Sequence, residues 1–152
     1  MIVYRCSTLQ WAKDISGTGA SLYGGRWNNP GTFMLYTAEN NILAALEIAI
    51  RIPLEQISKD YVMVPIEIPD ADAYIPKLSK TWYKEQELTR TLGDNFAIQG
   101  SHLLMKVPSA LISDAYNYLI NPHHALARKI TVKEPRSILM DKRLAEISKL
   151  KV

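Results

Sequence analysis

A single carboxylate in an otherwise apolar segment is the first candidate for chemistry. Glu47 lies within Ile42-Leu43-Ala44-Ala45-Leu46-Glu47-Ile48-Ala49-Ile50, where every other residue is apolar. A helix of this composition is mostly buried, so its carboxylate must face either a narrow strip of solvent or a cavity. The alternative is an exposed ion pair with Arg51 one helical turn further on, worth about 0.5 kcal/mol or less. The helix pattern leaves both interpretations open.

The loop SLYGGRWNNPG, residues 21–31, is a second candidate because it concentrates special residue types. Gly24 and Gly25 permit positive φ or close approach of the backbone to a ligand. Arg26 offers a planar set of donors suited to phosphate or carboxylate, and Trp27 offers a flat apolar surface. The alternative is a tight turn whose arginine pairs with a local acid and whose tryptophan covers the core. The sequence contains neither a Walker A nor a GxGxxG motif, which removes support for the common phosphate-binding loops.

Polar residues gather again in the second half of the chain. Ser109 follows a predicted strand but lacks the GxSxG context of a nucleophile, so we expect it to donate hydrogen bonds or to position other groups. Asn117 and Asn121 lie before a proline turn, and turn capping is an alternative for all three residues. His123 and His124 are adjacent, with no acidic or cysteine partner at ligand spacing nearby. The sequence therefore predicts no metal site.

Strands and short helices that position these residues can be read along the chain. The predicted strands cover residues 1–6, 33–36, 61–68, 103–107 and 137–140, and the predicted helices cover 41–51, 80–92 and a last segment from 143. Thr37 and Asn40 are candidate caps for the helix that carries Glu47. Pro65 suggests an edge strand or a bulge, and Gly93 is expected just past the end of the second helix. The pattern predicts an α+β fold with small mixed sheets and short helices.

Length and composition exclude several classes of protein. The 152 residues predict one compact domain over residues 1–152, with 47% hydrophobic and 22% charged residues. No apolar run approaches the roughly 18 residues that span a bilayer, and residues 1–5 show no export signal, so we expect a cytoplasmic protein without membrane contact. The lone Cys6 is expected to be a small strand residue. A net charge of +3 without clustered Lys or Arg argues against direct nucleic-acid binding.

Several short motifs in fixed order resemble the RES domain family. They cover nearly the whole chain and comprise Tyr4-Arg5, Gly17-Thr18-Gly19-Ala20, Gly24-Gly25-Arg26-Trp27-Asn28, Leu35-Tyr36-Thr37-Ala38-Glu39, Ala45-Leu46-Glu47, Val107-Pro108-Ser109, Asn117-Tyr118-Leu119-Ile120-Asn121-Pro122-His123 and Asp141-Lys142-Arg143-Leu144. The GGRWN and NYLINP segments are the most specific of these. The family takes its name from an arginine, a glutamate and a serine, which correspond here to Arg26, Glu47 and Ser109.

The resemblance implies a fold similar to that of ADP-ribosyltransferases and the function of a bacterial type II toxin that destroys NAD. It also implies an Xre-like antitoxin, with a helix-turn-helix DNA-binding region, whose C-terminal part covers the active site. Any DNA contact by the complex would then belong mainly to the antitoxin. NAD is the implied substrate, inorganic phosphate is a candidate co-substrate in place of water, and no cofactor is expected.

This reaction gives a chemical role to the candidate residues. Breaking the bond between nicotinamide and ribose builds positive charge on the sugar, which the carboxylate of Glu47 would stabilise. Arg26 and Arg5 would clamp the pyrophosphate, while Gly24 and Gly25 would allow its close approach. Because nicotinamide leaves as a neutral amine, no strong general acid is required.

Tyr36 and Ser109 are assigned to catalysis together with Arg26 and Glu47, and they would bind or orient the substrate. Tyr36 would stack on nicotinamide or on the ribose face, and Ser109 would fix an amide or a hydroxyl group. Trp27, Asn28 and Asn121 are assigned to substrate binding. Two other functions remain open: an ADP-ribosyltransferase that modifies a protein or small molecule, and a module that binds a nucleotide or RNA without chemistry.

Overall fold

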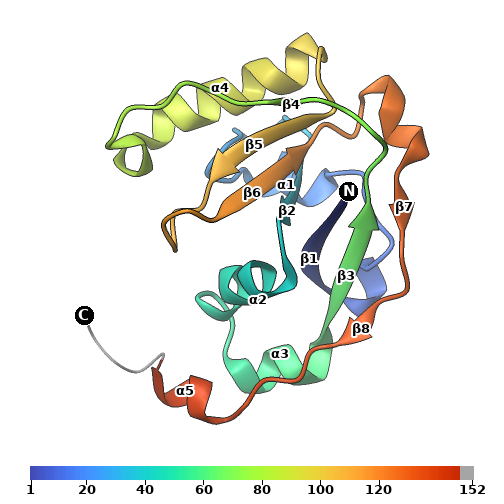
Figure 1. The fold of residues 1–152 in the computed structure, drawn as a ribbon, viewed down its shortest axis with the longest axis vertical. Helices are drawn as coiled ribbons and strands as arrows, with labels where there is room; N and C mark the ends of the chain where they lie inside the picture. The colour runs from blue at the N-terminus through green and yellow to red at the C-terminus, as the bar shows by residue number, and fades with distance from the viewer. Residues whose placement is uncertain (148–152) are drawn as a thin grey trace.

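The computed structural model describes residues 1–147 of the chain (Figure 1). Its strands, helices and 3₁₀ helices (η) are, in chain order, β1 (Ile2–Thr8), η1 (Leu9–Trp11), α1 (Thr18–Tyr23), β2 (Leu35–Ala38), α2 (Asn41–Ala49), α3 (Leu54–Asp60), β3 (Tyr61–Glu67), β4 (Ala73–Tyr74), η2 (Trp82–Lys84), α4 (Gln86–Gln99), β5 (Leu104–Pro108), β6 (Tyr116–Ile120), η3 (Ala125–Lys129), β7 (Thr131–Val132), β8 (Arg136–Ser137) and α5 (Arg143–Ile147). Residues 148–152 of the predicted domain lie outside the described part. The predicted α+β class is confirmed.

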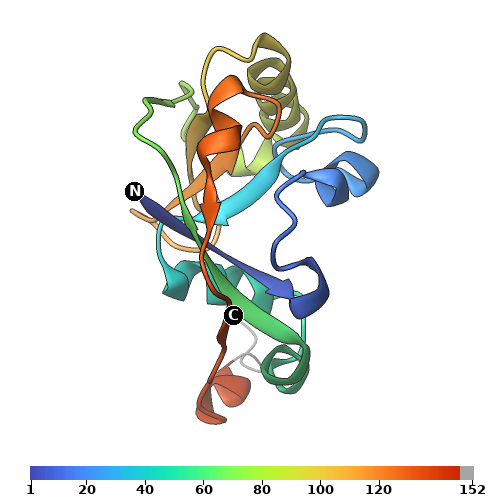
Figure 2. The ribbon, with the colours of Figure 1, turned by 90° about the vertical axis from the view of Figure 1, so that its right-hand side faces the viewer.

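The strands of the described chain form one sheet in place of the several small sheets expected. Its order is β4-β5-β6-β2-β1-β3-β7, and β8 also pairs with β3. β4 and β5 are parallel and the other pairs are antiparallel, so the sheet is mixed, as predicted. Figures 1 and 2 show that it is strongly twisted, with β5 and β6 in the upper half of the molecule and β3 in the lower half. This strand order places β6, β2 and β1 at the centre of the sheet.

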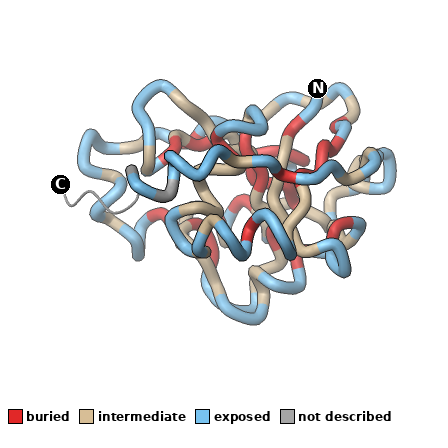
Figure 3. Tube along the Cα trace, turned by 90° about the horizontal axis from the view of Figure 1, so that it is seen from below, coloured by how far each residue is buried: buried red, intermediate tan, exposed pale blue. Residues whose placement is uncertain are grey.

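Apolar residues from the helices bury this sheet in separate clusters. One cluster joins α4 to the loop before β2 and to β5 and β6, and contains Trp27, Met34, Phe96, Met105, Val107 and Leu119. Another joins α2 and α3 to the sheet and contains Ala38, Leu43, Ala44, Ile57, Met63 and Ile138. Figure 3 shows the buried segments concentrated in the middle of the molecule. In the described residues no helix is long and apolar enough to cross a bilayer.

The helix that carries Glu47 begins and ends close to the predicted positions. Asn40 caps α2, because its side-chain oxygen accepts a hydrogen bond of 2.8 Å from the backbone N–H of Leu43. Pro53 follows α2 but also begins α3, a helix that the sequence analysis missed. A helix of seven residues gives too short a periodic pattern to recognise.

The prediction that Gly93 ends a helix is wrong. Residue 93 lies buried within α4, and the helix ends instead at Gly100, whose φ of 61° is left-handed. A Cβ atom at position 93 would come within 1.6 Å of the carbonyl oxygen of Trp27. The glycine is therefore required for close packing of α4 against the loop, and not for termination of the helix.

Several strand predictions need correction. The short strands β4 and β7 were not predicted, and the strand expected over residues 137–140 is observed as β8, Arg136–Ser137. β3 is an interior strand, so the edge position suggested by Pro65 is wrong; Pro65 lies between the residues that pair with β8 and those that pair with β7. A proline is tolerated there because the partner strand is interrupted. β6 was also not predicted, since Asn117 within it and Asn121 and Pro122 after it are typical of a turn.

Candidate functional site

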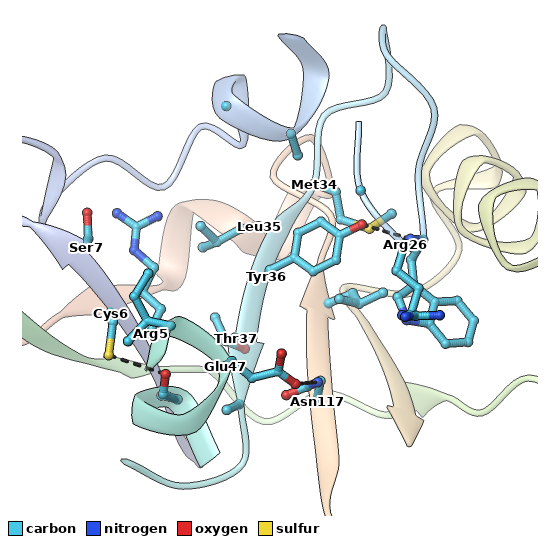
Figure 4. Close-up of a pocket in the computed structure, with 18 of the residues that line it drawn as sticks. Arg5, Cys6, Ser7, Arg26, Met34, Leu35, Tyr36, Thr37, Glu47 and Asn117 are labelled. Atoms are coloured by element: carbon cyan, nitrogen blue, oxygen red, sulfur yellow. Dashed lines mark hydrogen bonds between the residues drawn. The ribbon is translucent and has the colours of Figure 1, made fainter. Parts of the chain in front are cut away.

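A cavity of about 480 Å³ opens between α2, the loop after α1 and the strands β1, β2 and β6. This volume falls within the roughly 300–1,000 Å³ of small-molecule sites. Its charged and polar lining residues include Arg5, Asp14, Arg26, Tyr36, Glu47, Arg51 and Asn117. Figure 4 shows Tyr36 and Glu47 between Arg5 and Arg26. The fold thus brings together four predicted site residues that lie far apart in the sequence.

Glu47 faces this cavity from α2 and takes no part in the ion pairs that the structure describes. Its Oε1 atom accepts a hydrogen bond of 2.8 Å from Asn117 Nδ2 and a longer one of 3.4 Å from Ser109 Oγ. The carboxylate is half-buried, and both of these donors are neutral groups. Of the two interpretations of the sequence, the structure agrees with the cavity and not with an ion pair to Arg51.

Asn28 organises the loop and does not line the cavity. Its side chain is fully buried, and Nδ2 donates to the carbonyl oxygens of Ala20 at 2.8 Å, Asn29 at 3.0 Å and Thr32 at 3.1 Å. Its Oδ1 atom accepts a hydrogen bond of 2.7 Å from the hydroxyl of Tyr36. Because the protein itself uses both ends of the amide, the structure replaces the predicted substrate contact with a positioning role.

A second hydrogen bond of the Tyr36 hydroxyl also joins β2 to the loop. The hydroxyl oxygen accepts a hydrogen bond of 3.0 Å from the backbone N–H of Trp27, and burial raises the pKa of this phenol to about 12. A Cβ atom at Gly25 would lie 2.5 Å from the Tyr36 hydroxyl oxygen, and Gly24 has a φ of 71°. Both glycines line the cavity, and both are also required by the loop itself. The phenol is therefore a neutral anchor that leaves its ring at the cavity wall.

Arg26 lies at the cavity and is supported by η2. Its Nη1 atom donates a hydrogen bond of 3.0 Å to the carbonyl oxygen of Tyr83, and its guanidinium lies 6.0 Å from the ring centroid of Trp82. Trp27 itself is only 3% exposed, and its ring stacks on Trp82 with the centroids 5.6 Å apart. The stacking surface that the sequence suggested at Trp27 is therefore used by the core, and Arg26 lies over the ring of Trp82.

Arg5 reaches the cavity from the central strand β1. It donates a hydrogen bond from Nη2 to the carbonyl oxygen of Trp11, while its Nε atom is buried and has no hydrogen-bond partner within residues 1–147. Burial lowers the pKa of the Arg5 guanidinium, and the charge of Asp14 partly offsets this effect. A guanidinium with unused donors beside a cavity is suited to bind an anion.

Ser109 and Asn121 do not line this cavity. Ser109 is buried beside it and contacts Glu47, and its Oγ atom accepts a hydrogen bond of 3.1 Å from the N–H of Leu111. Asn121 lies past the end of β6, where its Nδ2 atom donates to the carbonyl oxygen of Ala97 in α4 at 3.1 Å. The structure therefore removes Asn121 from the predicted binding residues and gives Ser109 a contact with the carboxylate in place of one with the substrate.

Asn117 and Arg51 are among the lining residues that were not predicted as site residues. The alternation of β6 places Asn117 and Leu119 on the cavity side, with Tyr118 on the other. Recognition of this strand in the sequence would have separated Asn117 from Asn121. Arg51 is a third arginine that lines the cavity, whose lining also contains the carboxylates of Glu47 and Asp14. Over the described residues, no three His, Cys, Asp or Glu side chains are grouped as a metal ion would require.

Known proteins resemble this chain in sequence. The model of the RES domain matches residues 2–141. "Toxin Res" of Pseudomonas putida strain KT2440 is 36% identical over 88% of this chain and 92% of its own length. The "Prs ADP-ribosylating toxin" of Sphingobium sp. strain YBL2 is 33% identical over 88% of each chain.

A solved structure supports the fold independently. The crystal structure of the M. tuberculosis MbcT-MbcA toxin-antitoxin complex contains a chain that superposes with a TM-score of 0.72, over 97% of this chain and 88% of that one. At 15% sequence identity this likeness shows the fold, and it confirms the predicted architecture. Because the domain model covers almost all of the described residues and named Res toxins align along most of their length, this chain belongs to the RES domain family and is a relative of the Res toxins.

Proposed function

We propose that this protein is a toxin that cleaves the bond between nicotinamide and ribose in NAD. The observation that carries the proposal is the place of Glu47, a carboxylate held by neutral donors at the wall of a cavity that three arginines also line. A negative charge suits the sugar, where positive charge develops, and positive charges suit the pyrophosphate. One cavity therefore offers both kinds of recognition that NAD requires.

The chemical step needs little proton transfer. The glycosidic C–N bond breaks, its electron pair stays on the nicotinamide nitrogen, and the cationic ring becomes a neutral leaving group. The ribosyl cation that forms is stabilised by the carboxylate of Glu47 and is then captured by water or inorganic phosphate. Capture by water releases one proton and gives ADP-ribose, whereas capture by phosphate gives ADP-ribose 1″-phosphate.

The arginines and the tyrosine would orient the dinucleotide for this step. Arg5 and Arg26 lie on opposite sides of Glu47 in Figure 4, so a substrate held by both would cross the carboxylate. The ring of Tyr36 lines the wall between them. We assign the pyrophosphate to the arginines and the nicotinamide or ribose face to Tyr36.

A transferase activity on the same site is the second candidate. The Sphingobium relative is named as an ADP-ribosylating toxin and is 33% identical to this chain. The same ribosyl cation can react with a nucleophile on a protein or small molecule in place of water. The acceptor, and not the bond that breaks, would then distinguish the two activities.

The proposal includes a protein partner. The structural relative comes from a toxin-antitoxin complex, which supports an antitoxin for this chain as well. We assign to it the Xre-like, DNA-binding character expected from the sequence, and we place the toxin in the cytoplasm without direct contact to nucleic acid or membrane. No resident cofactor or metal enters the proposed reaction.

The decisive experiment incubates the purified chain with NAD and follows free nicotinamide by chromatography, with and without inorganic phosphate. Release in both buffers identifies a glycohydrolase, and release only with phosphate identifies a phosphorylase. NAD labelled in its adenylate part is added to a cell extract in parallel. Label recovered on a macromolecule supports the transferase, and unchanged NAD in every arm rejects a catalytic function in favour of a binding module.

A further inference from the structure

Asn117 is a residue of the site that the sequence analysis did not predict. It lies in β6 between β2 and β5, opposite Ala38 on one side and Val107 on the other. A strand paired on both sides has a fixed register, and side-chain alternation directs Asn117 towards the cavity. Figure 4 shows it directed at Glu47.

Glu39 fixes the position of this asparagine relative to α2. Its backbone N–H donates a hydrogen bond of 3.1 Å to the carbonyl oxygen of Tyr116, and its Oε1 atom accepts one of 2.9 Å from the N–H of Tyr116. The residue before Asn117 is thus held twice by the residue that precedes the Asn40 cap of α2. The strand that carries Asn117 and the helix that carries Glu47 are therefore joined at one turn.

The hydrogen bond from Asn117 reaches only one of the two carboxylate oxygens of Glu47. Asn117 Nδ2 and Ser109 Oγ both approach Oε1 of Glu47, at 2.8 Å and 3.4 Å. Within residues 1–147 no protein group donates a hydrogen bond to Oε2. One carboxylate oxygen is thus anchored, and the other remains available at the cavity.

We propose that Asn117 is a positioning residue that fixes the rotamer of Glu47 and leaves Oε2 to face the ribose of the substrate. This inference rests on the proposed function for its catalytic part, and on the geometry alone for the hydrogen bond. An amide suits the role because it holds the carboxylate without cancelling its charge. An arginine or lysine would form an ion pair and reduce the stabilisation of a developing cation, and a carboxylate would repel Glu47.

The kinetic test compares Asn117→Asp and Asn117→Leu, which are close in size to asparagine and lack its amide donor. Both variants should lower kcat for nicotinamide release by roughly 10- to 100-fold, the rate equivalent of one hydrogen bond to a charged group. The KM for NAD should stay within about twofold, because the arginines that bind the pyrophosphate are unchanged. Asn95→Asp, at an exposed position of α4, is the matched control and should keep the parental kcat.

A second measurement separates this inference from the proposed function. In the NMR spectrum of the parent chain, the side-chain amide protons of Asn117, assigned by their loss in Asn117→Asp, should shift strongly in Glu47→Gln, while those of Asn95 should not. If the parent releases no nicotinamide, the proposed function and the catalytic part of this inference both fail, even where the amide signals shift. If the parent is active but the amide signals do not respond, or the two variants keep the parental kcat, the positioning role is overturned and the function stands.

Discussion

Gly93 in α4 packs directly against the backbone of Trp27, so closely that a Cβ atom at position 93 would lie 1.6 Å from the Trp27 carbonyl oxygen. The neighbouring backbone of the loop is held to the same helix. Thr89 donates from Oγ1 to the carbonyl oxygen of Arg26 at 2.7 Å, and Arg90 donates from Nε to that of Gly25 at 2.9 Å. The loop that lines the cavity is therefore fixed by α4 as well as by its own hydrogen bonds.

Gly93→Ala should destabilise the protein strongly, since the added methyl group can be accommodated only by separating the helix from the loop. We expect the free energy of unfolding to fall by about 1–3 kcal/mol, the usual cost of overpacking. Gly19→Ala is the control: no atom lies within 4 Å of a Cβ there, and the residue is in α1. Urea denaturation should show Gly19→Ala unchanged or stabilised, and equal stabilities for the two variants would contradict the packing argument.

Glu47→Gln should preserve the fold while removing at least 99% of nicotinamide release, because the amide keeps the size of the side chain and loses the negative charge. Circular dichroism and a thermal melt check the fold, and chromatography checks turnover. Glu55→Gln, at an exposed position in the first turn of α3, controls for the loss of one charge and should remain active. Substantial activity in Glu47→Gln would exclude the proposed role of the carboxylate.

Tyr36→Phe should change how the stability of the protein depends on pH, because the variant lacks the buried phenol. The pKa of Tyr36 is raised from its ordinary value near 10 to about 12, so the folded state holds this proton more tightly than the unfolded state does. The resulting contribution is complete below about pH 10 and is lost as the pH rises towards 12. Tyr36→Phe has no phenol to ionise, so it does not lose stability in this way as the pH rises.

Denaturant unfolding at pH 9 and pH 11 measures this difference. At pH 9 we expect Tyr36→Phe to be less stable than the parent by about 1–2 kcal/mol, since the N–H of Trp27 and Oδ1 of Asn28 lose their common partner. By pH 11 the difference should narrow by ~1 kcal/mol. A difference that stays constant between the two pH values would show that the phenol is not selectively stabilised in the folded state.

Arg26→Lys should weaken substrate binding more than it slows the reaction. A lysine cannot reproduce both the hydrogen bond to the Tyr83 carbonyl and a two-point contact with a pyrophosphate. Initial-rate kinetics should give a KM for NAD that rises about tenfold with kcat changed little, the pattern of lost uniform binding. Arg128→Lys, at an exposed position of η3, should leave both constants unchanged. A fall in kcat without a change in KM would contradict the assignment of Arg26 to the pyrophosphate and indicate a role at the reacting centre.

The sequence predicted the residues of the site better than it predicted their contacts. Glu47 stood out because a lone carboxylate among apolar neighbours must face something specific, and the same composition predicted α2 close to its observed bounds. Asn28 was assigned to substrate binding but holds the loop, whereas Trp27 lines the cavity and also packs in the core. Both outcomes have one physical reason: a polar or aromatic residue in a glycine-rich loop is equally suited to a ligand and to contacts within the protein. Only the three-dimensional contacts distinguish those two cases.

Gly93 and β6 illustrate the same limit for the fold. The pattern ahead of Gly93 is typical of a helix end, and the contact that requires a glycine inside α4 comes from Trp27, distant in sequence. Asn117 disfavours a strand within β6, and the turn residues Asn121 and Pro122 follow it, but pairing with β2 and β5 and the neighbouring tyrosines outweigh that preference. Contacts between residues distant in sequence therefore explain both the continuation of α4 past Gly93 and the formation of β6.

The strict alternation along β6 links the folding of the protein to its proposed toxicity. Asn117 faces the cavity, while Tyr118 packs against the core on the opposite side of the sheet. A slip of one residue in the pairing of β6 would exchange these two side chains and place a polar amide in the core. The same error would thus cost the molecule both its stability and its hold on Glu47. A misfolded copy of this kind would therefore be less stable and, under the proposed function, slower at releasing nicotinamide.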